Sequence, residues 1–330
     1  MKRDSGIDVM RTIAIWVMLC ANAAPYLCPE NYPFSFRLIC SAAAPLFLFL
    51  AGYSFGMTHS SGKGSKFNGL YIIASAVIVD VCAWGIPPFV TFDVLYAIGF
   101  SLLFLELSSK IQKWILPATI AIVILSLPFI LPYYRFYNPE PDWSDLTPDL
   151  KRLFIDGWFP LLPWILFPVI GNLTFTYRSF LEKKSAISLV LSFFALIAGI
   201  VFCYFFKSTQ LLREGYTEFF YPADFTYLLF AVSGCLFLYL ILLKVKPLGE
   251  AYTNLLVLGR HSLFVYILHS FLISFVIDKL NLELSFSNFA IVMVAFFTIV
   301  YLLTFALEWM LKNGTLKMLP KWVRKPLGLY

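Results

Sequence analysis

Charge is scarce in this chain of 330 amino acids: only 13% of its residues are Asp, Glu, Lys or Arg, whereas 60% are hydrophobic. Soluble domains carry about 25% charged residues, so this composition excludes a soluble globular protein and predicts a polytopic membrane protein. A mean hydropathy of +0.80 agrees with that class. The first apolar run is too long for a secretory signal and has no obvious cleavage site, so we expect it to remain as a membrane span.

Sequence signatures of metal and nucleotide chemistry are also lacking. The six cysteines show no C-x-x-C spacing and lie mostly within apolar runs, which predicts small core residues rather than a metal site or a disulfide framework. The chain has no P-loop, dinucleotide-binding glycine pattern, G-x-S-x-G or H-E-x-x-H. The net charge of +6 comes without a basic-aromatic motif, so we expect no nucleic-acid partner.

What the sequence does contain is a series of long apolar stretches. A helix needs about 20 residues to cross a bilayer, and ten stretches come close to that length with at most two acidic residues each. We therefore predict an all-α bundle of about ten transmembrane helices that forms a single domain over residues 1–330. The stretches are 12–29, 38–58, 67–92, 93–108, 114–134, 157–177, 185–206, 225–243, 261–277 and 284–307.

The distribution of Lys and Arg predicts the orientation of the bundle. With a cytoplasmic N-terminus, most of the 25 basic residues fall on the cytoplasmic side, as the positive-inside rule requires. Both termini are then cytoplasmic, and the longest loop, residues 135–156, is extracytoplasmic. The short loops favour a bacterial cytoplasmic membrane. The oligomeric state stays open, with a homodimer as one candidate.

His269 is the only one of three histidines that falls well inside a predicted span. An ionisable group at membrane depth costs free energy and marks a functional site by default. A histidine side chain ordinarily changes charge near neutral pH, which makes this residue type suited to move protons. Spacings of four and three place Ser262, Tyr266 and His269 on one helix face. The alternative is a neutral histidine that only bonds a neighbouring helix.

The first predicted helix carries a polar stripe that begins just before the span 12–29. Asp8, Arg11 and Asn22 return to nearly the same face at 3.6 residues per turn. Asp8 and Arg11 also fit a simple ion pair near the interface, and Asn22 fits either a functional role or a helix–helix hydrogen bond. Arg260 and His261 lie at the cytoplasmic end of the ninth span, where they suit a phosphate-bearing donor or only the positive-inside rule.

Acidic residues gather toward the outer ends of the spans. Asp80 lies within the third span, whereas Asp93, Asp156 and Asp224 begin later helices, where an acid is also a good N-cap. With neighbouring polar and aromatic residues they would line a vestibule for a hydroxyl-rich ligand, although an aromatic belt explains the rings equally well. The neighbours are Asn22, Glu30, Trp84, Trp158 and Tyr221.

Four stretches, in order along nearly the whole chain, carry a family resemblance. They are 6–14 leading to Asn22, 44–54, 159–171 after Asp156, and 221–234 followed by 258–269. Together they resemble the transmembrane acetyltransferases related to heparan-α-glucosaminide N-acetyltransferase. The resemblance implies a bundle of ten or eleven helices that binds acetyl-CoA from the cytoplasm and acetylates an acceptor on the far side. The acceptor would be a sugar amine or hydroxyl on a glycan or glycolipid.

The resemblance places Asn22 and His269 in the reaction chamber and Arg11, Arg260 and His261 toward acetyl-CoA. Together with the polar residues described above, this predicts a role for each. Asn22 and His269 would be catalytic, with His269 as the base and Asn22 at the acceptor or the oxyanion. The donor contacts would be Arg11, Arg260, His261, Ser262 and Tyr266. The acceptor contacts would be Asp80, Asp156, Trp158 and Asp224. We expect no metal.

Two departures from the family pattern stand out. Thr12 replaces the glycine that usually follows the arginine. The animal enzyme has a proposed catalytic histidine between its first two helices, and residues 28–34 contain none. A covalent acetyl-histidine at that place is therefore excluded, which leaves another base, direct transfer, or a non-catalytic member of the fold. A proton-coupled transporter that uses His269 and Asp80 is the alternative from another class.

Overall fold

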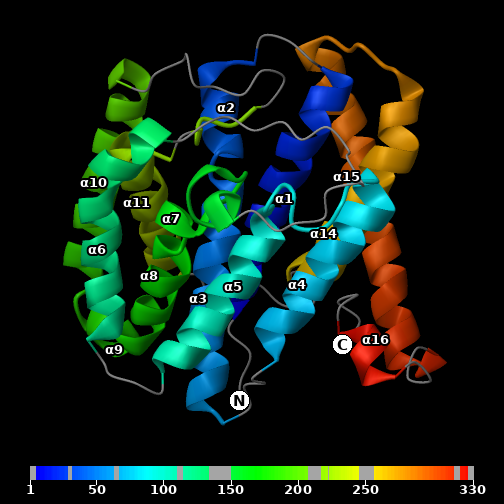
Figure 1. Ribbon diagram of the computed structural model, residues 1–330. Helices are drawn as coiled ribbons and strands as arrows, with labels where there is room; N and C mark the ends of the chain where they lie inside the picture. Colours follow the sequence, from blue (N-terminus) through cyan, green and yellow to red (C-terminus); the bar gives the residue numbers. More distant parts are fainter. Residues whose placement is uncertain are drawn as a thin grey trace.

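All regular structure in the described residues is helical (Figure 1). The computed structural model describes residues 5–28, 32–62, 67–109, 114–133, 150–206, 217–221, 223–244, 256–315 and 320–325. Within these ranges, eight helical segments are long and apolar enough to cross a membrane, and Asn68–Trp84 and Val94–Ser108 are two shorter apolar ones. The predicted all-α polytopic class is therefore confirmed. The cytoplasmic placement of the termini stays a prediction.

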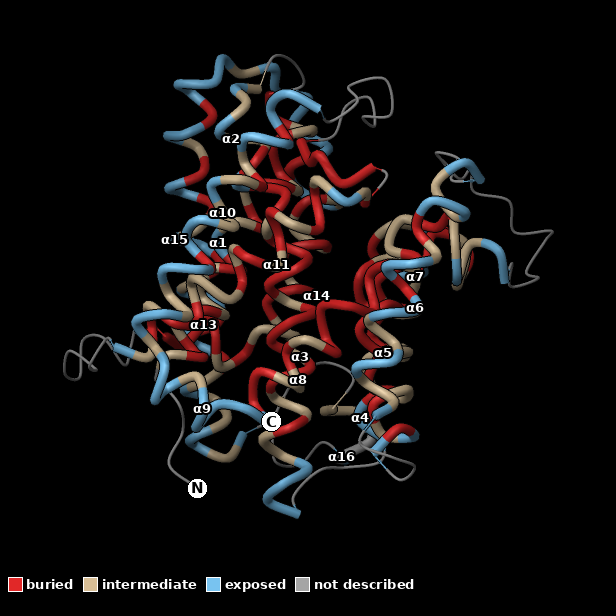
Figure 2. The backbone as a smooth tube through the Cα atoms, turned by 90° about the vertical axis from the view of Figure 1, so that its left-hand side faces the viewer, coloured by how far each residue is buried: buried red, intermediate tan, exposed pale blue. Residues whose placement is uncertain are grey.

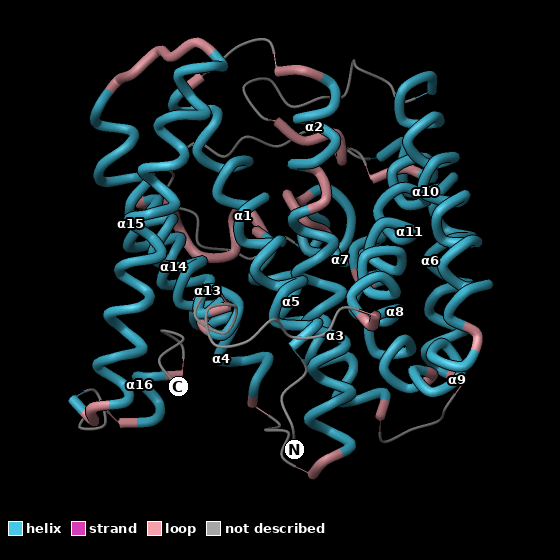
Figure 3. The backbone as a smooth tube through the Cα atoms, turned by 180° about the vertical axis from the view of Figure 1, so that it is seen from behind, coloured by secondary structure: helices cyan, strands magenta, loops and turns pink. Residues whose placement is uncertain are grey.

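The helices follow the predicted spans closely, with several breaks. Figure 3 shows the described helices, with loops and turns between some of them. The main α-helices are α1 (Ser5–Leu27), α2 (Phe34–Cys40), α3 (Ala43–Ser60), α4 (Asn68–Ile78), α5 (Val94–Ser108), α6 (Ile115–Ile130), α7 (Leu161–Trp164), α8 (Leu166–Thr176), α9 (Arg178–Lys183), α10 (Ser185–Phe206), α11 (Phe225–Leu242), α13 (Val257–Arg260), α14 (Ser262–Leu272), α15 (Phe286–Lys312) and α16 (Lys321–Arg324).

α1 is the central helix of the bundle. It packs against α3, α11, α13, α14 and α15, and its buried side chains are mostly apolar, with Met10, Ile15 and Leu19 fully covered. The outer helices instead expose apolar side chains, for example Phe194 on α10 and Ile291 on α15. Figure 2 shows many exposed positions along these two helices. This inside-out pattern is expected of helices whose outer faces contact lipid. The polar stripe of α1 therefore faces protein, not lipid.

The helix that carries His269 is broken at both ends. α13 ends at Arg260, and His261 has a non-helical backbone (φ −114°, ψ 35°) before α14 begins. Beyond Leu272 the chain continues as a π-helical turn, Ile273–Ile277. A second π turn, Val79–Trp84, carries Asp80 at the end of α4. Such π turns occur frequently at functional sites, where they change the direction of neighbouring side chains.

The predicted span 157–177 is likewise interrupted. A π turn covers Arg152–Asp156, and a non-helical stretch separates it from α7 and α8. Prolines at 160, 163 and 168 explain the interruption, because proline cannot donate a backbone hydrogen bond. In the non-helical stretch the backbone N–H groups of Trp158 and Phe159 donate to the carbonyl oxygens of Thr91 and Phe92, at 2.8 and 3.0 Å.

Glycine allows α3 and α8 to approach closely. A Cβ atom on Gly171 would lie 2.0 Å from the carbonyl oxygen of Phe49, and one on Gly52 would lie 1.9 Å from that of Pro168. Small residues at such crossings let two backbones come into contact within a membrane. The contact aligns α3, which lines the site described below, with the second half of the bundle.

We expect Gly171→Ala to destabilise the protein by about 1–3 kcal/mol, because the new methyl group overlaps a backbone atom that cannot rotate away. Unfolding of the purified protein in detergent measures the effect. Gly234→Ala is the matched control, since its Cβ would meet nothing closer than Leu196 Cδ1 at 3.6 Å. Equal stability of the two variants would show that α3 and α8 do not meet at Gly171.

Candidate functional site

Two cavities lie in series through the bundle. The first, the Asn22 cavity, has a volume of about 300 Å³, and the second, the Arg11 cavity, about 460 Å³. Arg11 and Asn22 both lie on α1, eleven residues or roughly 16 Å apart along the helix axis. Phe47, Val94 and Tyr266 line both cavities, so these three side chains form the junction between them.

Asn22 and His269 form a hydrogen-bonded pair beside the first cavity. Asn22 Nδ2 and His269 Nε2 are 2.9 Å apart. His269 Nδ1 lies 3.3 Å from the carbonyl oxygen of Val265, which can only accept a hydrogen bond. This assigns the proton of the neutral ring to Nδ1, so Nε2 carries a lone pair and accepts from the Asn22 amide. The sequence analysis predicted Asn22 and His269 as two separate site residues, and in the structure they are hydrogen-bonded to each other.

The two members of this pair differ in their access to the cavity. Asn22 lines the cavity, whereas His269 is 0% exposed and sits behind it. The Tyr266 ring packs edge-on against the imidazole, at a centroid distance of 5.0 Å. A ligand in the cavity therefore meets the Asn22 amide first, and reaches the His269 lone pair only by taking the place of that amide.

Asp93 and Tyr266 form a second polar pair at the junction. The Tyr266 hydroxyl donates to Asp93 Oδ2 at 2.5 Å, while Asp93 Oδ1 accepts from the backbone N–H of Val94 at the start of α5. Asp93 thus caps α5 and holds the Tyr266 hydroxyl at the same time. Asp80 lies nearby but inside the protein, where Oδ2 accepts from the Tyr96 hydroxyl at 2.6 Å. Asp80 supports α5 and does not line either cavity.

The Arg11 cavity carries the predicted donor residues. Arg11 donates to Asp8 Oδ1 at 2.9 Å and to Ser54 Oγ at 2.5 Å. Arg260 donates to Glu308 Oε2 at 2.6 Å. These two arginines line the cavity together with Ser262 and Tyr266, whereas His261 is buried behind the lining.

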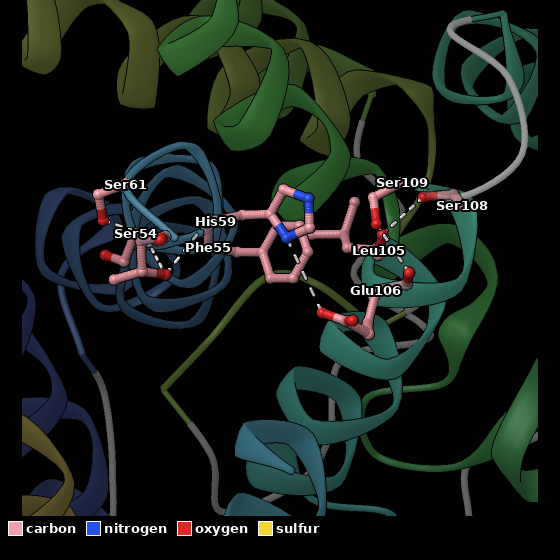
Figure 4. Close-up of polar contacts among 9 residues, drawn as sticks. Ser54, Phe55, His59, Ser61, Leu105, Glu106, Ser108 and Ser109 are labelled. Atoms are coloured by element: carbon pink, nitrogen blue, oxygen red, sulfur yellow. Dashed lines mark hydrogen bonds and ion pairs between the residues drawn. The ribbon is translucent and has the colours of Figure 1, made fainter. Parts of the chain in front are cut away.

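The α3 wall of this cavity continues to its end at Ser60. Ser54 and Phe55 line the cavity, and one turn further the His59 ring stacks on Phe55 at a centroid distance of 5.3 Å. Figure 4 shows His59 reaching toward Glu106 of α5, with His59 Nδ1 and Glu106 Oε2 4.0 Å apart. This contact links the ends of α3 and α5 on either side of the cavity.

Sequence reasoning missed Glu218. This buried acid lines the Asn22 cavity, and it lies on the non-helical segment 217–221, which also supplies Phe220 and Tyr221 to the lining. Ser41 Oγ accepts from the backbone N–H of Phe219 at 2.6 Å and so anchors the segment to the turn between α2 and α3. The sequence pattern that could have indicated it is E-F-F-Y at 218–221, just before a helix start. By composition alone this stretch is typical of an external loop.

The remaining predicted acceptor residues separate into two groups. Trp158 lines the Asn22 cavity, as do Trp84 and Tyr221. Asp156 instead forms an ion pair with Lys151 at 2.5 Å, and Asp224 accepts from Thr226 Oγ1 and from the backbone N–H of Tyr227. Neither is among the described lining residues of the two cavities. Glu30 lies outside the described residues.

Asp224 has the geometry of a helix N-cap, and this can be tested. We expect Asp224→Ala to lower the stability by about 1 kcal/mol, because the first turn of α11 loses its side-chain acceptor. Asp224→Asn keeps the cap and should match the wild type in both unfolding and turnover. If Asp224→Asn raises the KM for the acceptor at unchanged stability, the carboxylate contacts the acceptor after all.

Together, the fold and the cavities define an integral membrane protein with two chambers in series, a histidine–amide pair beside one and basic residues in the other. No group of three or more metal-ligating side chains occurs among the described residues.

Residues 3–189, more than half of the chain, match the model of a family described as heparan-alpha-glucosaminide N-acetyltransferase, catalytic. The chain therefore belongs to this family. Membership implies an acetyltransferase of the membrane that uses acetyl-CoA. A search of curated proteins finds no significant match.

Proposed function

We propose that this protein moves the acetyl group of cytoplasmic acetyl-CoA through the bundle to an extracytoplasmic acceptor. The observation that carries the proposal is the junction of Phe47, Val94 and Tyr266, which belongs to both cavities. A donor held in one cavity and an acceptor held in the other would meet there. The single chain 1–330 would supply both sites.

The Arg11 cavity is the proposed donor site. Arg11 and Arg260 place guanidinium groups where the phosphates of acetyl-CoA would enter, and guanidinium binds phosphate in a bidentate fashion. Ser262 and Tyr266 line the path of the uncharged pantetheine arm. His261 is buried at the break between α13 and α14 and does not line the cavity, so it is not a donor contact in this proposal.

The Asn22 cavity is the proposed acceptor site. Its lining combines the rings of Trp84, Trp158 and Tyr221 with the carboxylates of Asp93 and Glu218. Aromatic faces pack against the apolar faces of sugar rings, and carboxylates accept hydrogen bonds from hydroxyl and amino groups. These residues suit a terminal sugar of a glycan or glycolipid. Asp80 acts at a distance, through Tyr96 and the position of α5.

His269 is the proposed general base. The entering amine or hydroxyl replaces the Asn22 amide as hydrogen-bond donor to His269 Nε2, and Nε2 takes its proton as the acceptor attacks the thioester carbonyl. The released Asn22 N–H then donates to the developing oxyanion. The tetrahedral intermediate collapses with loss of the CoA thiolate, which takes the proton from His269 Nε2 to give CoA and returns the imidazole to its neutral form. The transfer is direct, in keeping with the absence of histidine from residues 28–34.

Reconstitution tests the proposal. Proteoliposomes supplied with radiolabelled acetyl-CoA on one face and a pool of sugar acceptors on the other should release CoA and acetylate the acceptor. Binding of CoA without turnover would favour the non-catalytic alternative. Neither binding nor turnover would overturn the acetyl-CoA assignment and favour a transporter.

A further inference from the structure

The last described residue of the chain lines the Arg11 cavity. Lys325 follows α16, which lies beside the end of the bundle where α4 begins (Figures 1 and 2). Its ammonium group sits over the ring of Tyr71 on α4, with Nζ 4.7 Å from the ring centroid. Tyr71 lines the same cavity. The C-terminal segment 320–325 thus brings a cation to the donor site from outside the bundle.

Lys325 differs from the two arginines of this cavity in its charge balance. Arg11 is paired with Asp8, and Arg260 with Glu308, so a carboxylate offsets each guanidinium. Within the part of the chain that the structure describes, Lys325 makes no ion pair; its contact is with the neutral Tyr71 ring. A phosphate that enters the cavity therefore meets a cation whose charge is not already balanced.

We propose that Lys325 is a phosphate-binding residue for the nucleotide end of the donor. The inference deepens the proposed acetyl-CoA site and rests on it. An ammonium group is a compact charge with three N–H donors and binds phosphate without a fixed geometry. Tyr71 holds the ammonium group at the cavity by a cation–π contact, which limits the freedom of a long side chain. The C-terminal segment thereby takes part in donor recognition.

The test compares donor kinetics in the full-length reconstituted protein. Lys325→Ala should raise the KM for acetyl-CoA about tenfold, the scale of a lost hydrogen bond to a charged group, and leave kcat unchanged because Lys325 is remote from the transfer. Lys325→Arg should restore the KM to within about threefold. Tyr71→Leu, which removes the aromatic ring beneath the ammonium group, should raise the KM by a few-fold.

Lys183→Ala is the matched control, an exposed lysine at the end of α9 that does not line the cavity. Acetyl-3′-dephospho-CoA, a donor that lacks the 3′-phosphate, shows which phosphate Lys325 contacts. If Lys325→Ala no longer raises the KM for this donor, the contact is with the 3′-phosphate. If the KM rises as it does for acetyl-CoA, the contact is with the diphosphate. An unaltered KM for both donors in Lys325→Ala overturns the inference while the acetyl-CoA site stands. A wild-type protein that neither binds nor uses acetyl-CoA overturns both.

Discussion

His269→Ala is expected to lower acetyl transfer by about 10²–10⁴-fold, the contribution that a positioned general base makes. The variant removes the Nε2 lone pair that accepts from Asn22 and would accept the acceptor proton. Binding of acetyl-CoA should be retained, because His269 lies beside the Asn22 cavity and is no part of the Arg11 cavity lining. Release of CoA by reconstituted protein measures the transfer, and equilibrium binding of CoA measures the donor site.

His59→Ala is the matched control for His269→Ala, since it also replaces a histidine by alanine but at a position outside the proposed chemistry. His59 lies at the end of α3, where its contact with Glu106 is outside the proposed chemistry, so turnover should stay close to that of the wild type. Asn22→Ala, and the double variant with His269→Ala, test whether the pair acts as a unit. The double variant should lose little more than His269→Ala alone, because residues of one catalytic unit are not additive. Wild-type turnover in His269→Ala would move the base elsewhere, and Asp93, which lines the Asn22 cavity, would be the next candidate.

The membrane class was predictable because so little charge is present. In lipid, an uncharged stretch of about 20 residues is stable as a helix, because the helix pairs its backbone N–H and C=O groups by internal hydrogen bonds. The approximate position of each span could therefore be predicted from the length of the apolar stretch. The breaks within them did not. The π turns at Val79–Trp84 and Ile273–Ile277 depend on packing against neighbouring helices, which a hydropathy pattern does not record.

The candidate site was predictable only in part, for a related reason. His269 and Asn22 stood out because polar groups at membrane depth are costly, yet their contact spans 247 positions of sequence. That Asn22 shields His269 from the cavity, and that Glu218 enters it on a non-helical segment, are consequences of tertiary packing. Asp224 is the reverse case, a residue that the sequence predicted for the site but that does not line it. An acid at a helix start looks the same in sequence whether it caps the helix or contacts a ligand.

The other large effect concerns the passage between the cavities. Val94→Phe is expected to lower turnover about 100-fold, because the larger side chain fills the junction at which the thioester and the acceptor must meet. A displacement of about 1 Å between reacting groups already costs a factor of this size. In the proposed donor site the phosphates bind elsewhere in the Arg11 cavity, so the affinity for CoA itself should change little. Turnover and CoA binding, measured on the same preparation, separate the two effects.

Val94→Ala is the matched control at this position. It widens the junction instead of filling it, and its turnover should stay within a few-fold of the wild type. Both variants keep Asp93, which caps α5 through the backbone N–H of residue 94, so the helix start is preserved in each. Full turnover in Val94→Phe would mean that the acetyl group does not pass the junction. The two cavities would then have separate ligands, and transfer through the bundle would have to be abandoned in favour of chemistry within one chamber.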